Sequence, residues 1–118
     1  MASATSVSTH ILDTSLGRPA AGVGVELSVR SGHDTPWAAH AGSVTDADGR
    51  CKDLPALPEG TTQVRLRFQT GPYLSREQRS GATAFFPEIS VVFAVGPGEH
   101  YHVPLLLTPF GYSVYRGS

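Results

Sequence analysis

The stretch HYHVPLLLTPFGYSVYRGS, His100 to Ser118, decides the fold class. Its first eight residues alternate between two sets, and the apolar set is Tyr101, Val103, Leu105 and Leu107. The other set is His100, His102, Pro104 and Leu106. A period of two is typical of a β-strand with one buried face. After a break at Thr108 to Gly111, the segment from Tyr112 to Tyr115 predicts a second, shorter strand.

Similar alternation recurs along the chain and predicts strands at 8–13, 23–30, 37–44, 62–70 and 89–95, with a short edge strand at Leu54–Leu57. Turn residues separate these segments at roughly ten-residue spacing, which is typical of a sandwich. Ser75 and Gln78 have the form of a capping box and Gly81 offers a stop, so one short helix is expected from Ser75 to about Ser80. We therefore predict an all-β antiparallel sandwich of seven to eight strands with one short helix. Residues 1–7 are expected to be a flexible leader, and residues 8–118 a single domain.

Composition narrows the classes of function. The chain has 118 residues, with nine basic and ten acidic residues and a formal net charge of -1. No basic patch suggests a nucleic-acid partner, and no apolar run reaches membrane-spanning length. Cys51 is the single cysteine, which excludes an intrachain disulfide and a thiolate metal cluster. Nothing at the start has the pattern of a signal peptide, so we expect a soluble, cytoplasmic protein.

Three motifs carry a family resemblance. They are STHILD with GRPAAGV (Ser8 to Val23), TDADGR (Thr45 to Arg50), and YHVPLLL followed by GYSVYRGS near Ser118. In this order they resemble the 5-hydroxyisourate hydrolases, the transthyretin-related enzymes of urate degradation. The resemblance implies a transthyretin-like sandwich assembled as a homotetramer, a dimer of dimers. It also implies hydrolysis of 5-hydroxyisourate to 2-oxo-4-hydroxy-4-carboxy-5-ureidoimidazoline without a cofactor, in clefts at the dimer–dimer interface.

The resemblance also assigns residues. His10, Arg50, His102 and Ser118 match catalytic positions of the family motifs, and His10 and Arg50 also belong to its substrate-binding set. The end of the chain adds further substrate-binding positions, which are Tyr115, Arg116 and Gly117. His100 is treated as a neighbour of the site, and His33 and His40 as surface or structural residues.

These residue types suit hydrolysis by direct attack of water. Histidine has an ordinary pKa of about 6.5, so it can take a proton from water near neutral pH. Arg50 nearby is expected to keep such a histidine neutral, because like charges lower a histidine's pKa. Its guanidinium also offers a planar set of donors to urate-type oxygens. We assign water activation and proton transfer to His10 and His102 without choosing the base.

Two other functions remain open from the residues. A transthyretin-like carrier would bind a small ligand without catalysis, although the Tyr-Arg-Gly-Ser end and the histidines with Arg50 argue against it. A zinc hydrolase would use His100 and His102, two apart on one strand face, with His10 as a third ligand. Arg-Gly-Ser differs from the Ser-Lys-Leu type of peroxisomal signal, so peroxisomal residence would require another route.

Overall fold

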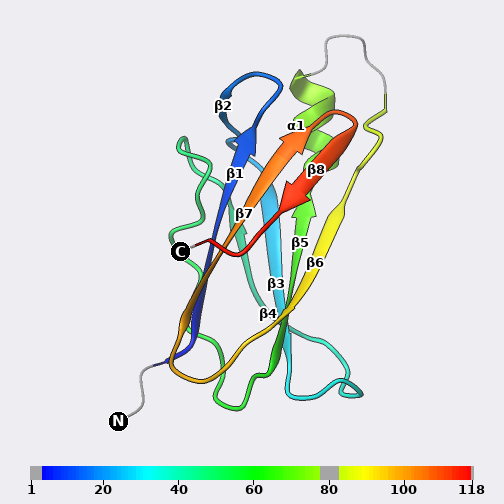
Figure 1. Cartoon of the computed structure of the whole chain (residues 1–118). Helices are drawn as coiled ribbons and strands as arrows, with labels where there is room; N and C mark the ends of the chain where they lie inside the picture. Colours follow the sequence, from blue (N-terminus) through cyan, green and yellow to red (C-terminus); the bar gives the residue numbers. More distant parts are fainter. Residues whose placement is uncertain (1–3, 78–82, 118) are drawn as a thin grey trace.

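The computed structural model describes residues 4–77 and 83–117. Two four-stranded sheets pack face to face, and a short helix lies at one end of the sandwich (Figure 1). This architecture confirms the predicted β-sandwich with a single short helix among the described residues. Because both sheets bury one face, the opposite face of each remains available to solvent or to a partner.

The first sheet has the order β2-β1-β7-β8. It is built from β1 (Ser6–Asp13), β2 (Arg18–Pro19), β7 (His100–Thr108) and β8 (Gly111–Val114). β1 and β7 pair in parallel, whereas β1–β2 and β7–β8 are antiparallel. The prediction of an antiparallel sandwich is therefore wrong for this one pair. The second sheet lies between β1 and β7 in the sequence, which gives the long connection that parallel neighbours require.

The second sheet is antiparallel throughout, with the order β4-β3-β5-β6. Its strands are β3 (Gly24–Arg30), β4 (Ala38–Val44), β5 (Gln63–Gln69) and β6 (Ile89–Ala94). These bounds confirm the predicted strands to within a residue or so at each end. The edge strand predicted at Leu54–Leu57 is absent. The Leu57 N–H donates to the Thr5 carbonyl at 2.9 Å, and the Ala56 carbonyl lies 2.8 Å from Nε2 of His40. Proline lacks the N–H that a strand ladder uses, and Pro55 and Pro58 interrupt this segment.

Two predicted elements begin earlier in the chain than expected. The helix α1 spans Thr70–Glu77, five residues earlier than the predicted start at Ser75. It follows β5 directly, Thr70 donates to the Phe86 carbonyl at 2.5 Å, and Pro72 stands in the first turn, where a missing N–H has no cost. Residues 78–80 and the expected stop at Gly81 lie outside the described residues. β1 begins at Ser6, two residues before the expected domain start, because Ser6 and Val7 pair with β7.

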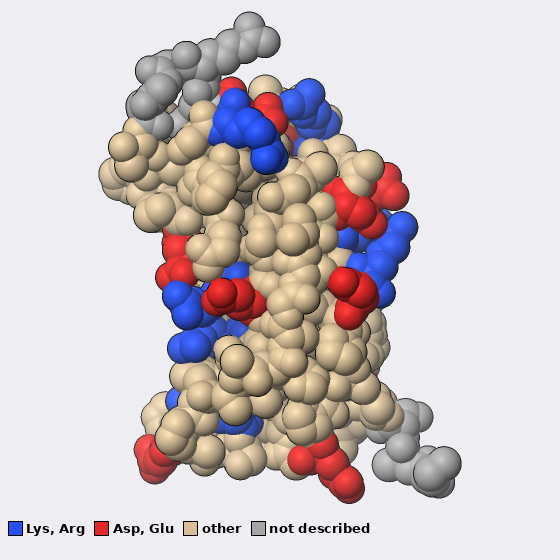
Figure 2. Space-filling view, turned by 180° about the vertical axis from the view of Figure 1, so that it is seen from behind, with Lys and Arg blue, Asp and Glu red and all other residues tan. Residues whose placement is uncertain are grey.

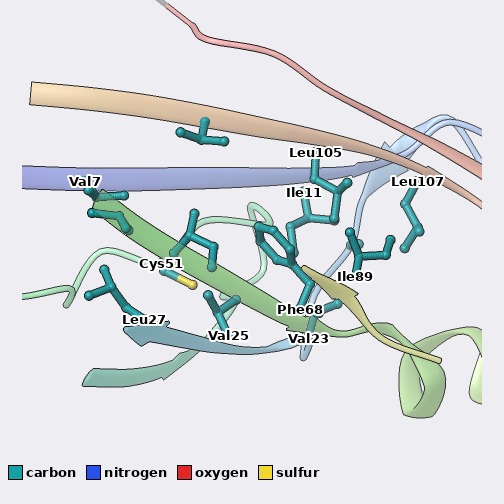
Figure 3. Packing of buried hydrophobic residues seen from close by; sticks show 14 of the residues in the cluster. Val7, Ile11, Val23, Val25, Leu27, Cys51, Phe68, Ile89, Leu105 and Leu107 are labelled. Carbon is teal, nitrogen blue, oxygen red and sulfur yellow. The ribbon is translucent and has the colours of Figure 1, made fainter. Parts of the chain in front are cut away.

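The core lies between the sheets (Figure 3). It contains alternate residues of the long strands, which include Ile11, Val25, Leu66, Phe68, Leu105 and Leu107, each at most 1% exposed. Fully burying a side chain of this size contributes about 1.5–3 kcal/mol. This burial fixes the register, since a slip by one residue would turn every core side chain outward. The outer face of the first sheet therefore carries the polar residues Ser6, Ser8 and His10 of β1 and His100 and His102 of β7.

The surface carries charges of both signs. From behind, Figure 2 shows acidic and basic side chains close together over a largely uncharged face, with no continuous basic area. Arg67 illustrates this, because it pairs with Glu88 at 2.6 Å and with Glu26 at 3.7 Å. Within the described part of the chain, no helix is long and apolar enough to span a membrane.

Candidate active site

The outer face of the first sheet brings His10 and His102 together. In the β1–β7 register Ser8 is opposite His102 and His10 is opposite Pro104, so the two histidines are diagonal neighbours on one face. Strand spacing and residue rise place their Cα atoms roughly 8 Å apart. Both side chains are partly exposed, which leaves their rings accessible from outside the sandwich. Residues ninety-two positions apart in sequence thus share one small surface.

A tight turn delivers Arg50 to the same place. Arg50 forms an isolated antiparallel bridge with His10, and the Ile11 N–H donates to the Gly49 carbonyl at 2.8 Å. Gly49 has φ of 76°, a conformation that favours glycine. A Cβ at this position would lie 2.4 Å from the Ile11 carbonyl oxygen. The turn packs directly on β1 only because residue 49 has no side chain.

Asp46 holds the turn and leaves the Arg50 guanidinium free. Its carboxylate accepts the backbone N–H of Asp48 at 2.9 Å and of Arg50 at 3.1 Å. The bond from Arg50 is the main reason why the pKa of Asp46 lies below its ordinary value. Lys52 pairs with both Asp46 and Asp48. Among the described residues, no carboxylate forms an ion pair with Arg50, so its charge is available to a ligand.

The protonation pattern of His10 follows from one hydrogen bond. Its Nε2 lies 2.8 Å from the Asp48 carbonyl oxygen. A carbonyl only accepts, so Nε2 carries the hydrogen and, in the neutral ring, Nδ1 carries the lone pair. The atom of His10 that can accept a proton is therefore Nδ1.

The surroundings of His102 favour its neutral form. Burial is the largest factor lowering its pKa below the ordinary value, followed by the positive charge of Arg50 and by His10 and His100. The predicted influence of Arg50 is thus found at His102. Its Nδ1 lies 2.8 Å from the Ser8 hydroxyl. That leaves Nε2 as the ring nitrogen able to exchange a proton with a ligand.

The end of the chain lies beside His102. The Gly117 N–H donates to the His102 carbonyl at 2.7 Å, and the Tyr115 N–H donates to the Pro104 carbonyl at 3.4 Å. A Cβ on Gly117 would lie 2.7 Å from Cδ2 of His102, so this segment also needs glycine to pass so closely. Ser118, predicted to be catalytic, lies outside the described residues.

Arg116 and Tyr115 point elsewhere within the single chain. The Arg116 guanidinium carbon is 4.8 Å from the centre of the Tyr101 ring, and its NH2 group is 4.0 Å from Glu99. With Tyr115 it lines a crevice of about 250 Å³ between β6 and β8. Of the predicted residues, the fold therefore brings together His10, Arg50, His102 and Gly117.

The sequence analysis missed two serines. Ser8 contacts His102 and also Nε2 of His100 at 2.8 Å, and Ser6 contacts Nδ1 of His100 at 2.6 Å. Their even spacing from His10 in the strand was the available signal, because residues i and i+2 share a face. The partner strand, however, was not evident from local pattern.

The donor groups do not form a preformed metal site. In the part of the chain that the structure describes, no three histidine, cysteine or acidic residues are arranged to hold an ion. Both ring nitrogens of His100 already contact serine hydroxyls, and Nε2 of His10 is bonded to Asp48. The zinc alternative therefore lacks its expected ligand set in these residues.

A larger hollow of about 570 Å³ lies away from the histidines. Its lining includes Thr5, Leu57, Glu59, Thr62 and Val95. Glu59 is the one titratable residue among its described lining residues, so this hollow offers little chemistry for a hydrolytic reaction. Size alone does not identify the active site in this molecule.

The known proteins that resemble this chain belong to one family. The family model described as the HIUase/Transthyretin family matches residues 7–117. A 5-hydroxyisourate hydrolase from Halalkalibacterium halodurans is 47% identical over 95% of this chain and 97% of its own length. The uric acid degradation bifunctional protein TTL of Arabidopsis thaliana is 44% identical over 95% of this chain, which spans only 37% of that protein.

Two solved structures share the fold. A 5-hydroxyisourate hydrolase from Klebsiella pneumoniae matches with a TM-score of 0.76 and 38% identity, over 95% of this chain and 98% of that one. A transthyretin from Sparus aurata matches with a TM-score of 0.81 and 33% identity, over 94% and 95%. Since an enzyme and a differently named protein fit about equally well, the fold does not distinguish their functions. The residues of the site must do so.

Proposed function

The chain belongs to the HIUase/transthyretin family, and from this premise we propose that it hydrolyses 5-hydroxyisourate in urate degradation. The reaction adds water to the ring and opens it, giving 2-oxo-4-hydroxy-4-carboxy-5-ureidoimidazoline. The observation that carries the proposal is the meeting of His10, Arg50 and His102 on the outer face of the first sheet. These residues place two imidazoles beside a guanidinium that pairs with no carboxylate of the described residues.

Arg50 binds and polarises the substrate. Its guanidinium presents several N–H donors in one plane, which suits the flat, oxygen-rich ring of a urate derivative. The same donors stabilise negative charge that develops on the attacked oxygen. Lys52 pairs with Asp46 and Asp48, the acidic residues of the turn, so the Arg50 guanidinium can bind the substrate.

The two histidines move the protons. Nδ1 of His10 and Nε2 of His102 are the ring atoms left available by their other bonds. A neutral imidazole takes the proton of an attacking water, and the second imidazole gives a proton to the departing ring nitrogen. No serine or cysteine nucleophile is part of this scheme, so water attacks directly. Either histidine fits the role of base.

A homotetramer with sites at the dimer–dimer interface completes the proposal. In one chain the site lies on an open sheet face, whereas ligand sites are usually concave. A second copy facing this surface would enclose it. The unpaired edge strands β6 and β8 and the exposed Phe85, Phe110 and Tyr112 support further pairing between copies.

The decisive assay follows the decay of freshly generated 5-hydroxyisourate with and without protein. We expect acceleration by the parent protein, and kcat lowered at least about 100-fold by His10→Asn, Arg50→Gln or His102→Asn. His33→Asn is the matched control, since His33 is an exposed loop histidine. Light scattering checks that each variant keeps its oligomeric state. Parent-like decay rates for all three variants would overturn the assignment, and stoichiometric binding without turnover would favour a carrier.

A further inference from the structure

A chain of hydrogen bonds runs from the outside of the molecule to His102. Ser6 Oγ contacts Nδ1 of His100 at 2.6 Å, and Ser8 Oγ contacts Nε2 of the same ring at 2.8 Å. Ser8 Oγ also contacts Nδ1 of His102 at 2.8 Å. His100 is exposed and His102 is partly buried, so the chain connects solvent with the interior of the site. The catalytic scheme above does not use Ser6, Ser8 or His100.

Two neutral states of this chain can pass a proton along it. A hydroxyl has one hydrogen, so Ser8 can donate to only one of the two rings, and proton transfer through Ser8 requires that it accept from the other. If Ser8 donates to His102, then His100 donates to Ser8 through Nε2 and accepts from Ser6 through Nδ1. His102 then carries its hydrogen on Nε2. If the direction reverses, His102 donates through Nδ1, and its Nε2 has a lone pair.

We propose that Ser8 and His100 are positioning residues that form a proton relay between solvent and His102. The proposal rests on the function proposed above, because it gives the relay a use in that reaction. In one step Nε2 of His102 gives its proton to the departing nitrogen, and Nδ1 takes the Ser8 proton. Ser8 takes a proton from His100, His100 takes one from Ser6, and Ser6 takes one from water.

The balance of this step is one proton from solvent to substrate, and every ring starts and ends neutral. The reverse direction removes a proton from the attacking water and releases one to solvent. A neutral pathway is needed here because the surroundings of His102 oppose an imidazolium. His10 on β1, His100 on β7 and Arg50 in the turn all disfavour it, as does burial.

No carboxylate relieves this constraint among the described residues that face His102. Asp46 and Asp48 pair with Lys52. Glu99 accepts from the Tyr101 hydroxyl at 2.8 Å and pairs with Arg116. Ser8 and the Gly117 backbone, which also contact His102, have no titrating side chain. The relay is therefore the route by which His102 changes its proton without becoming charged.

The test combines kinetics with nitrogen NMR on the intact protein. In Ser8→Ala we expect kcat about 10–100-fold lower with KM changed less than about twofold, because general acid–base transfer contributes on this scale. Dependence of kcat on the deuterium fraction of the solvent is expected to be curved in the parent and linear in Ser8→Ala. Ser8→Thr keeps a hydroxyl and a β-branched side chain that suits a strand, so it should retain at least about half the parent kcat.

The matched control is Ser90→Ala, an exposed serine of β6 in the other sheet, which should behave as the parent. If Ser8→Ala does not fold, His100→Gln interrupts the relay at an exposed position and should show the same kinetic changes. In protein labelled with ¹⁵N at histidine, loss of Ser8 should shift the ring nitrogens of both His100 and His102 and leave those of His33 unchanged.

Unchanged nitrogen shifts of His102 in Ser8→Ala, or a parent-like kcat with a curved isotope plot, would overturn the relay. Failure of the parent protein to hydrolyse 5-hydroxyisourate would overturn the proposed function instead. The NMR comparison needs no substrate, so it decides whether the relay exists in either case.

Discussion

Replacing Gly49 with alanine is the sharpest test of how the fold builds the site. Gly49 has φ of 76°, and a Cβ there would meet the Ile11 carbonyl oxygen at 2.4 Å and Cβ of Pro19 at 3.1 Å. Ordinary contacts at such a position begin at 3.4 Å, so the turn must move away from β1 by about 1 Å. Arg50 follows Gly49 directly, and it must move with the turn.

Two costs can be separated. The positive φ alone destabilises a non-glycine residue by about 1–2 kcal/mol. Displacing the turn also weakens the bond from the Ile11 N–H to the Gly49 carbonyl, which contributes about 1 kcal/mol. We therefore expect Gly49→Ala to lower the free energy of unfolding by about 2–3 kcal/mol. A misplacement of about 1 Å is expected to lower kcat/KM about 100-fold.

Gly60→Ala is the matched control. Gly60 has φ of 89°, but a Cβ there would have no neighbour within 4 Å. This variant should lose only about 1–2 kcal/mol and keep its kcat/KM. Urea unfolding followed by tryptophan fluorescence, together with the 5-hydroxyisourate assay, measures both quantities. If the two variants lose stability and activity to the same extent, the claim that Gly49 positions Arg50 is wrong.

Four further outcomes are expected. Gly117→Ala should lower kcat/KM about 10–100-fold with little change in stability, because the new Cβ would lie 2.7 Å from the His102 ring; assays and thermal melts would show this. Arg50→Gln should raise the pH midpoint of His102 in an NMR titration and Arg50→Lys should not, since the positive charge opposes protonation. Tyr73→Phe removes the bond from the Tyr73 hydroxyl to Asp13, so urea unfolding near neutral pH should show a free energy of unfolding lower by about 1.5–3 kcal/mol. In acid this variant should lose less stability than the parent protein does. Activity should persist in chelator, with no zinc by elemental analysis; loss of activity restored by zinc would contradict this.

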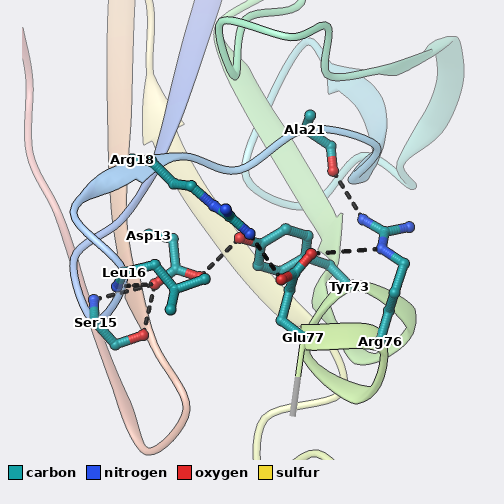
Figure 4. Close-up of polar contacts among 8 residues, drawn as sticks. All are labelled: Asp13, Ser15, Leu16, Arg18, Ala21, Tyr73, Arg76 and Glu77. Carbon is teal, nitrogen blue, oxygen red and sulfur yellow. Dashed lines mark hydrogen bonds and ion pairs between the residues drawn. The ribbon is translucent and has the colours of Figure 1, made fainter. Parts of the chain in front are cut away.

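The sign of the Tyr73 prediction follows from Asp13 (Figure 4). Burial raises the pKa of the Asp13 carboxyl, but hydrogen bonds from Ser15 and Tyr73 outweigh it, and the pKa lies below the ordinary 3.8. The folded state therefore binds its proton less readily than the unfolded chain. The stabilisation by the ionised Asp13 carboxylate is complete above about pH 4–5. It is lost as the pH falls through the pKa that Asp13 has in the folded state. If the free energy of unfolding of Tyr73→Phe falls in acid as steeply as that of the parent protein, the bond from Tyr73 to Asp13 has no such role.

The two faces of the long strands can be predicted from local sequence alone. The alternation of Tyr101, Val103, Leu105 and Leu107 with polar or less buried neighbours follows from the energy of burying one face, and it predicts which side chains of the His100 strand point inward. The tight turn before Arg50 is equally local, because Asp46 and Gly49 bond within five residues. The family motifs added the likeness to hydrolases and the residues His10, Arg50 and His102.

The start of the helix could not be predicted from local sequence. Ser75 and Gln78 have the form of a cap, yet α1 begins at Thr70, where the end of β5 and a bond to Phe86 fix it. The capping pattern describes a preference worth about 1 kcal/mol, and packing of Tyr73 and Leu74 into the core exceeds it.

Which strands pair, and which faces come together, depends on the packing of the whole molecule. The parallel pairing of β1 with β7 is a long-range choice, set by how two sheets bury their apolar faces together, and no local pattern encodes it. That pairing places Ser8 against His102 and joins it to His100, contacts between residues more than ninety positions apart. Strand identity is a local property of the chain, whereas the partner of a strand depends on the whole core, and so the site became visible only when the sheets were assembled.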